Sequence, residues 1–241
     1  MIGRLVLMRG IFAREAGMTR RGWLALGALG LLALIVLLPL RLVLGMAMPE
    51  NVTARSVEGS VWDGRIADLN IGPLPLGTVD AGLEPLPLLI GRTQFAISRE
   101  GFSAKGGAHG ISQATGSIAL PDGLGGLPVT AVTFNRFSVR MDGGGCAQAE
   151  GTLGVTLASF GPLMPNGLAL SGVARCEKGA LVVPMSGSQG MERLALRLTG
   201  DGRWQADLTL TGLPQEAADA LRAGGFDARP GGVGIGTSGA F

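Results

Sequence analysis

Short runs of alternating apolar and polar residues, separated by glycine, recur along the chain from about residue 50 onward. In the segment 194–210, leucines alternate with polar or small residues on both sides of Gly200-Asp201-Gly202. Such alternation places one face of a strand in water and the other in a core, and a glycine-rich step between two runs is typical of a hairpin turn. We therefore predict a β-hairpin over 194–210.

The same pattern predicts antiparallel strands along most of the remaining chain. A second hairpin is expected over 168–187, with its turn at Glu177-Lys178-Gly179. A short helix is expected over 214–223, because proline opens the segment and two glycines follow it. The glycine-rich segment after Ile235 is expected to be a frayed tail, with a final weak strand as the alternative. The other expected strands are 60–71, 77–83, 93–99, 102–105, 116–120, 129–141 and 150–157.

An uncharged apolar run over 23–40 lies near the start of the chain and continues, after Arg41, to Met48. Eighteen helical residues extend about 27 Å, close to the thickness of the hydrocarbon core of a bilayer. Five arginines against Glu15 alone precede the run, and such a basic flank holds an N-terminus in the cytoplasm. The pattern predicts a cytoplasmic basic N-terminus at 1–22, a transmembrane anchor at 23–48 and a periplasmic β domain at 49–241.

A cleaved secretory signal ending near Gly45-Met46-Ala47 is the alternative to this anchor, and either one places the later residues outside the cytoplasm. The long basic segment and the long apolar run favour an anchor. The expected fold is mainly β: a single N-terminal transmembrane helix, then a glycine-rich, antiparallel, curved and open β-sheet domain with one short late helix. The expected location is the bacterial inner membrane, crossed once.

The two cysteines, Cys146 and Cys176, fit an oxidising compartment, where an even pair usually forms a disulfide. Two free buried thiols are the alternative. A zinc site is not expected, because two cysteines and the distant His109 do not supply four ligands.

Charge and composition exclude several classes of function. Residues 1–41 hold six of the 20 basic residues and one of the 18 acidic ones, which leaves 14 basic against 17 acidic residues in the rest of the chain. A nucleic-acid-binding face needs the opposite balance. The single histidine, His109, lies among glycines, and no local motif predicts a catalytic, cofactor or metal site. We expect neither an enzyme nor a bound cofactor.

Two Pro-Leu-Pro steps lie within residues 72–92. Each proline removes a backbone donor from a β-ladder, so these steps are expected at sheet edges or in loops. Protection of an open edge is one interpretation, and docking of a partner is the other. The apolar stretch 181–183 is a further candidate contact. The candidate partner-contact residues in the proline-rich segment are Pro73, Pro75, Pro85, Pro87 and Leu88.

Several segments, taken in order, resemble protein N of the type II secretion system. They are EGSVWDGR (58–65), GPLPLG (72–77), EPLPLLIGR (84–92), LSGVARCEKGAL (170–181), GRWQADLTL (202–210) and the C-terminal stretch 221–241. The resemblance implies a non-enzymatic accessory component of the inner membrane that contacts other components of the secretion machine in the periplasm. It carries over no catalytic residue.

A weaker similarity, to periplasmic proteins with an apolar β-groove, implies the alternative of a membrane-anchored protein that binds or transfers lipid. Lipid is thus the one small-molecule ligand under consideration. An unrecognised hydrolase is the third hypothesis. An open apolar concave face would favour the lipid groove, and converging ionisable groups in a pocket would favour the enzyme.

Overall fold

A computed structural model describes residues 20–47, 52–72, 74–121, 123, 127–159 and 167–240. The chain divides into two compact units, Met1–Leu38 and Pro39–Phe241. In the first unit the structure describes one helix, α1 (Arg20–Val36). None of the helices within the described ranges combines the length and the apolar character needed to cross a membrane.

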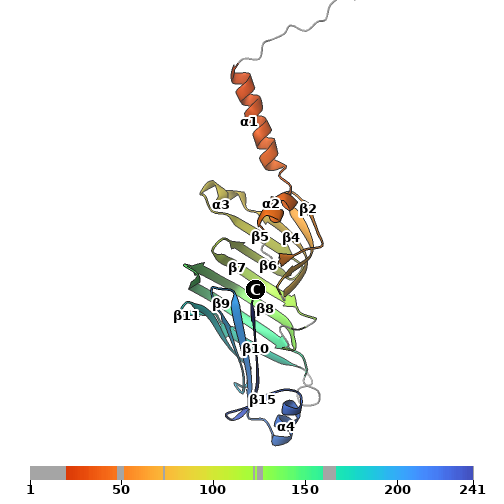
Figure 1. The fold of residues 1–241 in the computed structure, drawn as a ribbon, viewed down its shortest axis with the longest axis vertical. Helices are drawn as coiled ribbons and strands as arrows, with labels where there is room; N and C mark the ends of the chain where they lie inside the picture. The colour runs from red at the N-terminus through yellow and green to blue at the C-terminus, as the bar shows by residue number, and fades with distance from the viewer. Residues whose placement is uncertain are drawn as a thin grey trace, which may run out of the picture. The chain divides into compact units, whose positions relative to one another are not determined.

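The second unit is built on one antiparallel sheet of 16 strands, counted over the described residues (Figure 1). Most strands pair with their neighbours in sequence, in the order β1-β3-β4-β5-β6-β7-β8-β9-β10-β12-β13-β14-β16-β15, while β2 pairs with β3 and β11 with β12. The strands are β1 (Val52–Thr53), β2 (Ser56–Gly59), β3 (Gly64–Ile71), β4 (Leu74–Leu83), β5 (Gln94–Arg99), β6 (Phe102–Gly107), β7 (Gly110–Ala119), β8 (Val129–Asp142), β9 (Gly145–Leu157), β10 (Leu168–Val173), β11 (Arg175–Glu177), β12 (Ala180–Ser186), β13 (Glu192–Leu198), β14 (Arg203–Thr211), β15 (Asp227–Arg229) and β16 (Gly232–Ala240). The expected mainly β, antiparallel and open sheet is confirmed.

The hairpin predicted over 194–210 is formed by β13 and β14. Leu194 pairs with Leu208, and Leu198 pairs with Trp204 at the turn. The predicted helix over 214–223 is also present, as α4 (Gln215–Ala223), which begins after Pro214. In both places the local sequence pattern and the tertiary fold agree.

The C-terminal segment is a strand, so the prediction of a frayed tail after Ile235 is wrong. Strand β16 pairs with β14 along its whole length. Glycine is needed here for close packing: a Cβ on Gly232 would lie 1.9 Å from the Leu210 carbonyl oxygen, and one on Gly239 would lie 2.9 Å from the Trp204 indole nitrogen. The glycines that resembled a flexible tail let β16 lie against its neighbour.

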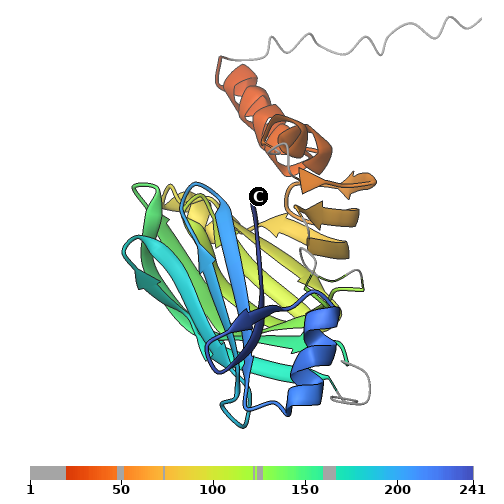
Figure 2. The same cartoon turned by 60° about the horizontal axis from the view of Figure 1, so that its bottom comes forward.

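One apolar cluster forms the core of the second unit. Figure 2 shows the sheet curving, with α4 placed across one end of it. The helix contributes Ala218 and Leu221, and the strands contribute fully buried leucines and valines. Aliphatic side chains from β3 at one end of the sheet to β16 near the other belong to the same cluster. Their burial against one another on the inner face stabilises the curved form of the sheet.

The apolar run predicted as one anchor over 23–48 forms two helices, α1 and α2 (Leu40–Ala47). Pro39 lies between them and forms a bridge with Ser60, and a proline disfavours helical geometry at the residue before it. Leu40 is 6% exposed and belongs to the core of the sheet. The boundary between the units therefore falls after Leu38, whereas hydropathy had placed it after Met48.

Two hairpin turns touch through glycine backbones at one end of the sheet. A Cβ on Gly200, in the β13–β14 turn, would lie 1.5 Å from the carbonyl oxygen of Gly144, in the β8–β9 turn. We expect Gly200→Ala to lower the free energy of unfolding by about 1–3 kcal/mol, because the turns must separate to admit a methyl group. Denaturant unfolding would measure it. The control is Gly154→Ala, where the nearest atom lies at 3.5 Å, and equal stability of the two variants would contradict the contact.

Candidate interaction surfaces

The proline-rich segment begins in strand β4, at a place where the sheet is incomplete. Pro75 pairs with Asn70 of β3, whereas β5 pairs only with Asp80 to Leu83 of β4 in the described register. The Arg99 guanidinium instead donates a hydrogen bond of 2.6 Å to the carbonyl oxygen of Leu76. Pro75 thus lies in an inner strand, on a stretch that has a strand neighbour on one side. Pro73 lies outside the described residues.

The second Pro-Leu-Pro step forms a short helix, α3 (Pro85–Leu89), in the connection between β4 and β5. This agrees with the expected loop position of Pro85 and Pro87, which occupy the first and third positions of the helix. The side chains of Pro87 and Leu88 are half-buried. Leu86, Leu89 and Ile90 are 76%, 82% and 71% exposed, and we call these three side chains the α3 apolar surface.

Hydrogen bonds fix the base of α3 to the sheet. The Leu83 N–H donates to the Val61 carbonyl at 2.8 Å, and the Glu84 N–H donates to the Gln94 carbonyl at 2.8 Å. Lys105 of β6 forms an ion pair with the Glu84 carboxylate. The apolar surface is therefore carried by a segment whose position is set by the β2–β3 turn, β5 and β6.

Helix α2 and helix α3 lie at the same end of the sheet (Figure 1). The turn between β2 and β3 connects them, since Ser60 bridges to Pro39 and Val61 accepts the hydrogen bond from Leu83. Leu42 of α2 is 52% exposed, which adds a further apolar side chain to this end.

Two of the three residues of the apolar stretch 181–183, a candidate contact by sequence, lie inside the core, and Val182 between them is half-buried. Leu181 is 5% exposed and Val183 is 0% exposed, and both belong to the buried cluster. Because β12 lies between β10 and β13, Leu181 and Val183 pack within the curved sheet and are not available to a partner. This part of the contact prediction is wrong.

Cys146 of β9 and Cys176 of β11 form a disulfide, with 5.5 Å between their Cα atoms. Pairing between β9 and β10 stops at Thr152 and Val173, and β11 then pairs with β12. The disulfide therefore joins the first half of β9 to β11, in the region where β9 is no longer paired with β10.

The sequence profile of a family described as type II secretion system (T2SS), protein N, matches residues 50–236. The chain belongs to this family. No curated protein and no solved structure matches it. The matched residues span nearly all of the sheet and include α3, α4 and the disulfide. This family consists of accessory components of the type II secretion system.

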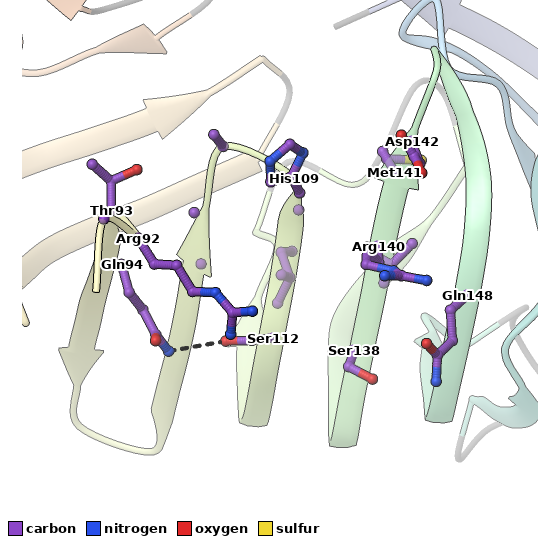
Figure 3. A pocket seen from close by; sticks show the side chains of 17 residues that line it. Arg92, Thr93, Gln94, His109, Ser112, Ser138, Arg140, Met141, Asp142 and Gln148 are labelled. Atoms are coloured by element: carbon purple, nitrogen blue, oxygen red, sulfur yellow. Dashed lines mark hydrogen bonds between the residues drawn. The ribbon is translucent and has the colours of Figure 1, made fainter. Parts of the chain in front are cut away.

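A shallow, open hollow of about 800 Å³ lies over the ends of β5 to β9 in this protein N family member (Figure 3). Polar and apolar side chains both line it, and the Gln94 amide donates a hydrogen bond of 3.2 Å to the Ser112 hydroxyl. His109 and Arg140 lie on its wall. Across the described residues, no three histidine, cysteine, aspartate or glutamate side chains gather as metal ligands would.

Among the described residues, the acid with the most perturbed pKa lies in the β13–β14 turn and does not line this hollow. A hydrogen bond from the Thr199 hydroxyl, and then one from Arg203, lower the pKa of Asp201 to about 2 from an ordinary 3.8. Since the folded pKa is depressed, the stabilisation is present above about pH 3.8 and is lost as the pH falls toward 2. Asp201 thus stabilises the turn locally.

The sequence did not single out Leu86, Leu89 and Ile90. The run PLPLLI between Glu84 and Gly91 could have drawn attention to them, because six apolar residues in a predicted loop are unusual. Only the fold shows which of the six side chains are exposed.

Proposed function

We propose that this chain is a non-enzymatic, inner-membrane accessory component of the type II secretion system, acting through protein contacts in the periplasm. The match to the protein N family over residues 50–236 carries the proposal. In the proposed topology the basic segment 1–22 is cytoplasmic, α1 holds the chain in the membrane and the sheet is periplasmic. The arginines before α1 and the disulfide in the sheet support this arrangement.

The proposed contact with other secretion components is the incomplete edge of β4 around Pro75, together with Pro73 before it. An extended segment of a partner can pair beside a strand that has a strand neighbour on one side, and here the Arg99 side chain, in place of a strand, occupies the Leu76 carbonyl. Thr78 is exposed on the same stretch, before β5 begins to pair at Asp80. Pro85, Pro87 and Leu88 belong to α3, whose partner is argued below.

Site-specific photo-crosslinking tests this contact. A photoreactive residue at Thr78 of the full chain, in native membranes, is expected to capture other secretion-system subunits, identified by mass spectrometry. Thr115 is the matched control, because it is an exposed threonine on β7 that pairs with Ser103 of β6. Equal capture from both positions, or capture of no secretion subunit from Thr78, would contradict the proposed edge.

The lipid-groove alternative is less well supported. Inward-facing side chains of the described strands pack into one buried cluster, which includes Val79, Leu157 and Leu208 at 1% exposure each. An apolar lining for lipid would need these side chains to be exposed along the concave face. We therefore retain the protein-contact hypothesis.

A further inference from the structure

We propose that the α3 apolar surface of Leu86, Leu89 and Ile90 contacts the lipid bilayer, inserting into the leaflet that faces the sheet domain. The inference rests on the proposed membrane anchoring, and it assigns the bilayer as the partner of α3 within the proline-rich segment. Exposed, contiguous apolar side chains mark protein or membrane contacts, and three neighbouring aliphatic residues are each more than 70% exposed here.

The α3 apolar surface is presented by a fixed segment. Pro85 and Pro87 restrict the backbone, and the N–H groups of Ile90 and Arg92 both donate to the Pro87 carbonyl, at 3.2 and 2.9 Å. Since the base of α3 is also hydrogen-bonded to the sheet, the aliphatic side chains cannot turn inward to join the core. They remain available to a partner outside the sheet.

The position of α3 identifies that partner as a bilayer. Three residues separate Val36 of α1 from Leu40 of α2, so a membrane-held α1 keeps Leu40 within roughly 10–14 Å of its own end. Leu40 is packed in the sheet, and α3 is joined to the same end through the β2–β3 turn. The chain connection therefore tethers this end of the sheet, which carries α3, close to a membrane-held α1.

Charges around α3 suit a bilayer that contains anionic lipid. Arg92 follows the α3 apolar surface and is exposed, and Arg41 is exposed on α2. Glu84, directly before α3, is paired with Lys105. A basic side chain beside an apolar one can contact a lipid headgroup while the apolar group enters the acyl region.

The test places a polarity-sensitive fluorophore on single cysteines of the full chain, in vesicles of phosphatidylethanolamine and phosphatidylglycerol. The native cysteines are joined in the disulfide and stay unlabelled without reductant. We expect a probe at L89C to shift to shorter wavelength and to be quenched by at least twofold with brominated acyl chains. Val173, 63% exposed on β10, is the matched control, and V173C is expected to show neither effect.

A third probe separates failure of this inference from failure of the membrane anchor. Leu29 lies in α1, and L29C reports whether that helix enters the bilayer. Quenching at L29C without quenching at L89C would overturn the α3 contact and leave the anchor standing. Absence of quenching at both positions would overturn the anchor as well.

Photo-crosslinking from Leu86 in native membranes tests the competing occupant. We expect lipid adducts to predominate, since the bilayer is the partner at this surface. Predominant capture of another secretion subunit would overturn the inference and assign the α3 apolar surface to a protein. Thermal unfolding of each variant checks that the sheet is intact.

Discussion

Replacing both Cys146 and Cys176 by serine is expected to lower the free energy of unfolding by about 3–4 kcal/mol. The disulfide closes a loop with a sequence separation of 30 residues, and this magnitude follows from the entropy that the closed loop removes from the unfolded chain. The effect should be large because the bridge lies where β9 has no ladder to β10. Chemical denaturation with and without reductant would measure it.

The double serine variant also supplies the control for reduction. Reductant should destabilise the native chain by a similar amount and should leave the variant unchanged, since it has no thiol. Under non-reducing conditions an alkylating reagent should modify neither Cys146 nor Cys176 in the native protein. Ready labelling of both cysteines would contradict the disulfide. A free energy of unfolding of the native chain that is the same with and without reductant would contradict its stabilising role.

The hairpin over 194–210 and the late helix could be predicted because their local signals agree with their tertiary surroundings. Leucines alternate on both sides of Gly200-Asp201-Gly202, and the buried face of β13 and β14 is the face that the alternation selects. Pro214 likewise marks the start of α4 as helix-start rules predict. Where the structure follows a periodic pattern, sequence is sufficient.

The predictions for the C-terminal segment and for the extent of the anchor over 23–48 were wrong because the same local pattern occurs in two different structural environments. The glycines of β16 are typical of a flexible tail, but Gly232 and Gly239 lie against Leu210 and Trp204, and this close approach depends on a distant strand. The apolar run that continues through Leu40 looks like one membrane segment, although Leu40 packs in the sheet. In both cases the deciding neighbour is far away in sequence.

The proline-rich segment shows the same limit in the candidate site. Proline excludes a fully paired position, and Pro75, Pro85 and Pro87 all lie where a ladder donor is dispensable. Composition does not show which apolar neighbours remain exposed, because that depends on how β4 and β5 hold α3. Leu86, Leu89 and Ile90 are exposed, whereas Leu181 and Val183, in an equally apolar stretch, are buried.

Leu181→Ala is expected to lower the free energy of unfolding by about 2–5 kcal/mol, because it leaves a cavity in the packed inner face of the sheet. Leu181 is 5% exposed and pairs with Leu198 of β13 and Cys176 of β11, so the site has little freedom to collapse. The matched control is Leu89→Ala, because Leu89 is 82% exposed on α3 and its truncation should change stability by less than about 0.5 kcal/mol. Both values come from denaturant unfolding of the full chain in detergent. Equal stability of Leu181→Ala and Leu89→Ala would contradict the burial of Leu181 and would restore it as a candidate contact residue.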